Sequence, residues 1–353
     1  MIMIPACILG ILVILFGIWA LISSGKIRTY EGDKSLSEKF VMDINGVANG
    51  FFINSRDTDA PVLLLVSSGP GTDDYFLTDK YEDMRIEDDF TIVYWDYRGM
   101  GIAYSDDTDT ESITMEALVS DAHEVTAYLK ERFGKDRIYI MGFSGGSHIA
   151  LRTVQQYPED YIAYIGMAQV VTDSTERDTL MYDYMLGKFT QRGDQGALRR
   201  LESYVEHTDD KTVRCTAGWP EYVDLLHEAG GGTIKDKSEF EGIVLPILMC
   251  RCYTISEKIA YIKGMKMYRN TPMAEETKGF DYRTLIPQLS VPVYFISGED
   301  DYNCPWPLVE EYCEGLSAPK KEFFLVPDAA HSPLWENPAR TCDILRQIKE
   351  ETD

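Results

Sequence analysis

The chain has 353 residues, more than one compact core usually needs, so a main domain with an insertion is expected. Its formal net charge of −24 gives a surface that repels phosphate backbones, and nucleic-acid binding is therefore not expected. The apolar and charged fractions are those of an ordinary globular protein and argue against disorder.

The chain begins with an apolar stretch. Residues 2–22 carry no charged side chain, and roughly 20 apolar residues are enough to span a bilayer. A secretory signal peptide, one alternative, usually has basic residues before a shorter apolar core. A buried helix of the fold, the other alternative, is not expected because the segment is apolar all round. We therefore expect an uncleaved transmembrane anchor over residues 1–25. Lys26 and Arg28 follow it, and the positive-inside rule would then place the main part of the chain, after a single-pass membrane anchor, in the cytoplasm.

A hairpin and a series of buried strands follow a polar linker. Residues 40–43 and 47–53 flank Asn45-Gly46, a pair that suits a tight turn with positive φ angles. Four short apolar runs then predict strands that are buried on both faces. These runs are residues 62–66, 90–95, 138–141 and 161–167.

Helical patterns separate these runs. Residues 115–129 repeat apolar side chains at three- and four-residue steps, and residues 146–156 form a second helical segment that Pro158 closes. Strands and helices that alternate in this way predict a mostly parallel sheet with helices on both faces. We expect residues 26–172 to form the first part of this sheet domain.

The alternation then stops and returns near the end of the chain. Residues 173–284 are helical and polar and lack buried strand runs, which predicts a helical cap inserted into the sheet domain. Strand patterns reappear at residues 293–297 and 322–326. Residues 285–353 are therefore expected to complete the sheet domain.

The seven cysteines do not suggest a disulfide framework or a metal site. Their number is odd and no CxxC pair occurs. Cys250 and Cys252 lie two residues apart, but no matching cluster of histidine or cysteine follows them. We expect free thiols, which favour a reducing compartment.

The strongest motif is Gly142-Phe-Ser-Gly-Gly146, which fits G-x-S-x-G. It follows a predicted strand and opens a predicted helix, which is the setting of a nucleophile elbow. This sharp turn raises the serine above the sheet and requires small residues two positions away. Ser144 is therefore the predicted nucleophile, at a helix amino terminus that favours developing negative charge. A serine in an ordinary glycine-rich turn is the alternative.

A serine nucleophile needs a general base and a carboxylate to orient that base. His331 follows the last predicted strand, at the sheet edge where open α/β folds bind ligands. The other four histidines lie in helical patterns or in the insertion. Asp301 follows the preceding strand and is the predicted acid, with Asp300 as the alternative. The chain order Ser, Asp, His is the order of hydrolases with this elbow.

The oxyanion of the reaction needs backbone N–H donors. Gly145, directly after the nucleophile, is one predicted donor. The segment Ser67-Ser-Gly-Pro-Gly71 follows the first central strand, and Gly69 within it is the predicted second donor.

The order of these motifs resembles that of the proline iminopeptidase-like branch of the α/β hydrolases. Besides the elbow, four segments carry the resemblance: residues 67–71 (family HGGPG), 95–101 (DQRGxG), 298–305 (GxxDxxCP) and 330–332 (GHS). The acid loop aligns the family's acid with Asp301. Ser67 and Ser68 stand where the family has His-Gly, so the packing of this loop is expected to differ.

The resemblance implies an α/β-hydrolase fold with a helical cap, and a serine hydrolase of small amide or ester substrates. Peptides with an N-terminal proline are one candidate class, since the family's peptidases read the free amine with cap carboxylates. The insertion offers acids for this role, but none aligns: Glu221, Asp224, Glu228, Glu239 and Glu241. No metal or organic cofactor is implied, and the expected partner is a small molecule or short peptide.

Two other hypotheses remain open at this stage. One is a carboxylesterase or lipase-like enzyme that acts near the bilayer. The other is a catalytically silent binding protein that kept the fold.

Overall fold

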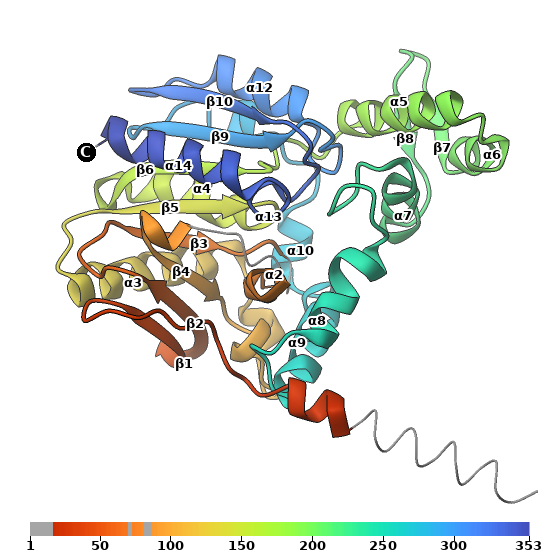
Figure 1. Ribbon diagram of the computed structural model, residues 1–353. Helices are drawn as coiled ribbons and strands as arrows, with labels where there is room; N and C mark the ends of the chain where they lie inside the picture. The colour runs from red at the N-terminus through yellow and green to blue at the C-terminus, as the bar shows by residue number, and fades with distance from the viewer. Residues whose placement is uncertain (1–16, 70–72, 81–85, 353) are drawn as a thin grey trace, which may run out of the picture.

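An eight-stranded sheet forms the centre of the computed structural model, which describes residues 17–69, 73–80 and 86–352 (Figure 1). The strands of this sheet are β1 (Leu36–Ile44), β2 (Val47–Ser55), β3 (Val62–Val66), β4 (Thr91–Asp96), β5 (Ile138–Phe143), β6 (Tyr161–Met167), β9 (Val293–Gly298) and β10 (Lys321–Val326). Their order is β1-β2-β4-β3-β5-β6-β9-β10. The pairs β1–β2 and β2–β4 are antiparallel and all others are parallel, which confirms the mostly parallel sheet.

The predicted hairpin forms the antiparallel end of the sheet. Asn45 and Gly46 have φ angles of 52° and 79°, the left-handed values that a two-residue turn of this type requires. The turn pairs Ile44 with Val47 and sets the register of the whole β1–β2 pair.

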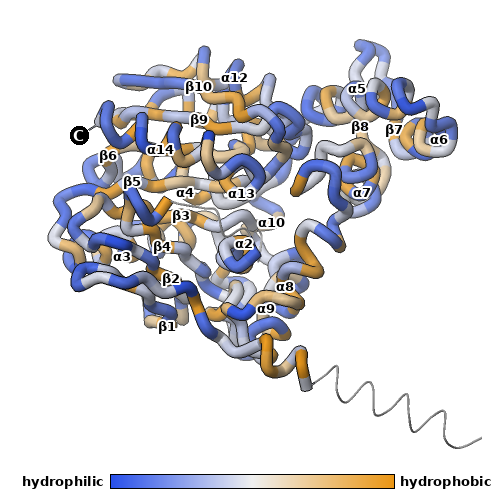
Figure 2. Tube along the Cα trace, in the orientation of Figure 1, coloured by the Kyte–Doolittle hydropathy of each residue, from blue (hydrophilic) through white to orange (hydrophobic). Residues whose placement is uncertain are grey.

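Helices cover both faces of the sheet. One face packs against α3 (Met115–Phe133), α4 (Gly146–Gln156) and α12 (Trp306–Gly315), and the other against α2 (Tyr75–Lys80) and α14 (Pro338–Thr352). Successive strand residues point to opposite faces, so Leu64 joins the first cluster and Leu63 joins the second. Figure 2 shows hydrophobic residues along the central strands and hydrophilic ones along the outer helices. The core thus holds the carboxyl ends of the strands in fixed positions.

The segment between β6 and β9 forms a separate group of helices beside the sheet (Figure 1). Its main elements are α5 (Thr175–Arg192), α6 (Gln195–Ser203), α7 (Trp219–Ala229), the π-helical turn Phe240–Val244, α8 (Leu245–Met249), α9 (Ile255–Tyr268) and α10 (Pro272–Glu276). It also contains a short hairpin, β7 (Val205–His207) with β8 (Val213–Cys215), where we expected no strands. We call this group the cap, and its boundaries at residues 173 and 284 stay a prediction.

The predicted transmembrane anchor requires correction. Among the described residues, no helix is long and apolar enough to cross a membrane. The described part of that segment includes a helix at residues 17–22. Its Trp19 donates from Nε1 to the carbonyl of Leu248 at 2.7 Å, so it packs against the cap. Residues 1–16 lie outside the described residues.

The single-pass membrane localisation, with the catalytic domain in the cytoplasm, rested on that anchor. It is therefore wrong together with the anchor, because the described chain contains no helix able to hold it.

Candidate active site

Ser144 sits on a sharp turn between β5 and α4. Its φ angle is 50°, a left-handed value that a non-glycine residue adopts only when its surroundings impose it. A Cβ at Gly142 would lie 2.6 Å from the backbone of Ser147, and one at Gly146 would lie 2.2 Å from the carbonyl oxygen of Val66. Both motif positions therefore require glycine for the steric reason that the sequence indicated.

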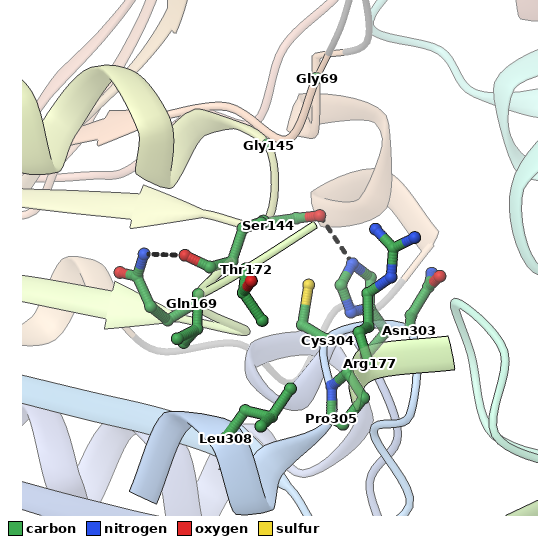
Figure 3. A pocket seen from close by; sticks show the side chains of 13 residues that line it. Gly69, Ser144, Gly145, Gln169, Thr172, Arg177, Asn303, Cys304, Pro305 and Leu308 are labelled. Carbon is green, nitrogen blue, oxygen red and sulfur yellow. Dashed lines mark hydrogen bonds between the residues drawn. The ribbon is translucent and has the colours of Figure 1, made fainter. Parts of the chain in front are cut away.

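Three side chains from separate loops meet at this turn. His331 Nε2 lies 2.8 Å from Ser144 Oγ, a bond that Figure 3 draws as a dashed line from Ser144. On the other side of the ring, His331 Nδ1 lies 3.1 Å from each carboxylate oxygen of Asp301. The structure thus brings together the predicted nucleophile, base and acid, while their catalytic roles stay a prediction.

Asp301 and Asp300 have different surroundings although they are adjacent. Asp301 is fully buried, and its Oδ1 also accepts the backbone N–H of Cys304 at 2.9 Å. Asp300 faces the cap, where Lys188 and Lys235 place their ammonium groups 3.0 and 2.7 Å from its carboxylate. Of the two candidates, only Asp301 has its carboxylate in hydrogen-bond contact with His331.

The charge of Asp301 tunes the imidazole ring. Burial, the largest single effect, lowers the pKa of His331, but the charge and hydrogen bond of Asp301, with smaller contributions from Glu336 and Asp74, raise it, and the net pKa lies above the usual value. A raised pKa makes the ring a stronger base toward the Ser144 hydroxyl.

The two predicted oxyanion donors are neighbours. A Cβ at Gly145 would lie 2.8 Å from the carbonyl oxygen of Gly69, so the close approach of the two loops requires glycine at position 145. Gly69, Gly145 and Ser144 line the same cavity. Both glycines therefore border the space in front of Ser144, and their role as N–H donors stays a prediction.

Two cavities meet at Ser144 and His331. The smaller has a volume of about 230 Å³, and in Figure 3 Gln169 lies on one side of Ser144 while Arg177 and Asn303 lie on the other. The larger has a volume of about 500 Å³. Its lining is mainly apolar and combines core and cap residues: Phe76, Leu77, Phe143, Ile243, Tyr261 and Met265. A substrate at Ser144 thus meets a small space with a mixed polar and apolar lining and a larger, mainly apolar one.

The sequence reasoning missed two carboxylates next to this site. Asp74 lines the larger cavity and accepts bonds from the backbone N–H and the hydroxyl of Ser68. Glu336 accepts backbone N–H groups of the loop that carries His331. Neither belongs to a motif with a fixed spacing, because their partners are mostly backbone groups that every residue supplies.

The remaining histidines and cysteines have local partners. His148 Nδ1 contacts the hydroxyl of Tyr282 at 2.7 Å, and His123 stacks on Tyr157. The cysteines in the described residues are free thiols. In those same residues, no group of three or more His, Cys, Asp or Glu side chains is arranged to hold a metal ion.

Comparison with known proteins establishes the class of this molecule. The chain belongs to the alpha/beta hydrolase family, whose model matches residues 63–344, and it is therefore a hydrolase. The sheet, the elbow and the inserted helices described above are consistent with that membership. The family's fold supports a small-molecule or peptide substrate.

Particular relatives narrow the class further. A Bacillus subtilis (strain 168) protein named "Probable aminopeptidase YbaC" is 28% identical over 312 residues, which cover 88% of this chain and 96% of that protein. The proline iminopeptidase of Mycobacterium smegmatis shares the fold with a TM-score of 0.62 and 16% identity, over 89% of this chain and 98% of its own. A Thermogutta terrifontis esterase shares it with a TM-score of 0.52 and 18% identity, over 90% and 99%. The resemblance to aminopeptidase-like hydrolases is therefore confirmed.

Proposed function

We propose that this hydrolase acts through a catalytic triad of Ser144, His331 and Asp301. His331 takes the proton of the Ser144 hydroxyl as Oγ attacks an ester or amide carbonyl. His331 then gives this proton to the leaving group, and an acyl-enzyme forms on Ser144. Water, activated by the same imidazole, releases the acid and restores the serine.

The observation that carries this proposal is the unbroken chain of contacts from Ser144 through His331 to Asp301 at the wall of a cavity. Asp301 keeps the proton of the neutral ring on Nδ1, so that Nε2 is free to act as base. In the proposed mechanism, the N–H groups of Gly69 and Gly145 stabilise the negative oxygen of the tetrahedral intermediate.

Two substrate classes deserve a direct test. The names of the relatives support an aminopeptidase, with peptides that begin with proline as one candidate class. The apolar lining of the larger cavity supports a carboxylesterase that accepts an apolar acyl group. In either case the first step is the same attack by Ser144.

A fluorophosphonate probe tests the triad, because it labels only an activated serine. We expect rapid labelling of the wild-type protein and none of Ser144→Ala. We expect labelling of His331→Ala to fall by about 10³-fold or more. Equal labelling of the wild type and Ser144→Ala, or no labelling of either, contradicts the proposal and favours a silent binding protein.

A substrate panel then separates the two classes. Proline 2-naphthylamide reports aminopeptidase activity, and 4-nitrophenyl esters of increasing chain length report esterase activity. A kcat/KM that rises with acyl length and no release of naphthylamine would support the esterase.

A further inference from the structure

Glu336 holds the loop that carries His331. It is the last residue of α13 (Pro333–Glu336), five positions after the histidine. Its carboxylate accepts the backbone N–H of Ala330 at 3.1 and 3.2 Å and that of Ser332 at 2.7 Å. These two donors lie immediately before and after His331, so one side chain fixes the backbone on both sides of the proposed base.

The same carboxylate also binds the cap. The backbone N–H of Lys235, in the loop that follows α7, donates to Glu336 Oε1 at 2.6 Å. This loop makes a second contact nearby, because the backbone N–H of His331 donates to the carbonyl of Gly232 at 3.4 Å. Glu336 therefore lies at a junction between the cap loop and the histidine loop.

The hydrogen bonds to Glu336 are strong enough to hold the backbone segments that donate them. Bonds from backbone N–H groups to an ionised carboxylate are about twice as strong as bonds between neutral groups. Burial raises the pKa of Glu336, while its bonds to Lys235, Ala330 and Ser332 act in the opposite direction. A half-buried carboxylate with three backbone donors fixes all three segments to one another, since a lost donor leaves a less well solvated charge.

We propose that Glu336 is a positioning residue that couples the docking of the cap loop to the placement of His331. This inference rests on the proposed function, since it takes His331 to be the general base. Glu336 touches neither Ser144 nor the larger cavity among the contacts described, so it acts through the histidine backbone. When the cap loop docks, the N–H of Lys235 completes the set of donors to the Glu336 carboxylate, and the histidine loop is fixed for catalysis.

The first test replaces the carboxylate by an amide of the same size. In Glu336→Gln one oxygen becomes an NH₂ group, which cannot accept a backbone N–H. We expect kcat and the rate of fluorophosphonate labelling to fall by about 10- to 100-fold, because a small displacement of a catalytic group has this effect. We expect KM to change by less than about threefold, since the cavity walls are untouched. Glu350→Gln, an exposed residue of α14, is the matched control and should behave as wild type.

A pH profile adds a readout that loss of stability alone would not move. The negative charge of Glu336 is one of the groups that raise the pKa of His331. The acidic limb of kcat/KM should therefore shift to lower pH in Glu336→Gln. In Glu350→Gln it should stay in place.

The second test removes only the contact from the cap. Lys235 occupies the first central position of a turn in which Lys237 N–H donates to the carbonyl of Ile234 and Asp236 has a φ of 55°. Proline is favoured at that position, so Lys235→Pro removes the N–H donor while it suits the turn. Lys235→Ala is the matched control, because it also loses the ammonium group but keeps the N–H. We expect kcat of Lys235→Pro to be about three- to tenfold below that of Lys235→Ala.

The outcomes separate this inference from the proposed function. Wild-type kcat, labelling rate and pH profile in Glu336→Gln would overturn the positioning role. Equal kcat in Lys235→Pro and Lys235→Ala would overturn the coupling to the cap, and this comparison decides it even if Glu336→Gln does not fold. Failure of the proposed function would instead appear in the wild type, as the absence of serine labelling.

Discussion

At the scale of single residues, the contact between Ser68 and Asp74 bears most directly on the chemistry. The backbone N–H of Ser68 donates to Asp74 Oδ2 at 2.6 Å, and the Ser68 hydroxyl donates to Oδ1 at 2.5 Å. Burial raises the pKa of Asp74 to about 7, although both bonds from Ser68 lower it. Ser68 directly precedes Gly69, so an ionised Asp74 holds the proposed oxyanion loop in position.

We expect Asp74→Asn to lower kcat/KM by about tenfold, because an amide cannot accept both donors of Ser68. The folded pKa of about 7 lies above the unfolded value, so the competent ionised form is present at higher pH and is lost as pH falls through 7. Part of the acidic limb of the wild-type profile should therefore be absent in Asp74→Asn. The measurement is kcat/KM from pH 5 to 9.

Two variants serve as controls for the Asp74→Asn experiment. Ser68→Gly, which restores the residue that the family carries, keeps the N–H bond and should lose less activity than Asp74→Asn. Asp107→Asn, at an exposed position, should match wild type. A wild-type profile in Asp74→Asn would show that Asp74 does not hold the loop.

The site residues that the sequence predicted share one property. Ser144 lies in a turn whose neighbours must be glycine, and Asp301 and His331 lie in the loops that follow β9 and β10, so the local sequence marks all three. Asp74 and Glu336 could not be found in this way. Most of their partners are backbone N–H groups, which every residue except proline supplies, so no residue pattern records these contacts.

At the scale of elements, a buried pair of carboxyl groups joins the end of β4 to the start of α2 and to the cap. Asp96 accepts the backbone N–H of Ile102 at 2.8 Å, and Asp73 accepts the hydroxyl of Tyr253, just before α9. Burial raises the pKa of Asp73 to about 6 and that of Asp96 well above its usual value. The two groups are fully buried side by side, which favours a form that shares one proton.

This pair should make stability depend on pH. Both folded pKa values exceed the unfolded value near 4. The contribution of this pair to the stability of the fold is therefore fully present below that pH, and it is lost as pH rises through about 6 and beyond. Asp96→Asn removes the second charge but keeps the size of the side chain. We expect its free energy of unfolding, relative to wild type, to rise between pH 5 and pH 8 by on the order of 2 kcal/mol.

Urea unfolding at both pH values measures this difference. The buried His148, whose pKa falls to about 3, has the opposite effect on stability, but it is present in both proteins and cancels. Asp107→Asn again serves as the control. A difference between Asp96→Asn and wild type that is the same at pH 5 and pH 8 would exclude a shared proton.

Sequence patterns identified elements well wherever burial is complete. The runs at 62–66 and 161–167 became β3 and β6 without change, because strands buried on both faces must be apolar throughout. The hairpin β7–β8 was missed because its strands have three residues each and several exposed side chains. The transmembrane anchor predicted from the apolar start of the chain was wrong for another reason. Hydropathy does not distinguish a helix that packs on the cap, as residues 17–22 do, from one that enters a bilayer.

At the scale of the whole molecule, the net charge of the chain gives a test of the substrate class. The chain carries 58 acidic and 34 basic residues, and the larger cavity is lined by two acids, Asp74 and Glu239, and one base, Arg269. A strongly negative protein attracts cationic ligands toward its clefts, and salt screens this attraction over about 10 Å at 0.1 M. An aminoacyl substrate carries a positive amine, whereas a simple ester carries no charge.

We therefore expect kcat/KM for proline 2-naphthylamide, if it is hydrolysed, to fall by about three- to tenfold between 10 and 300 mM NaCl. The loss should appear in KM while kcat stays constant, because screening weakens the encounter rather than the chemistry. A neutral 4-nitrophenyl ester measured in the same solutions is the control and should show no such fall. Equal salt dependence for both substrates would mean that the negative field does not reach Ser144, and the excess acid would then serve solubility alone.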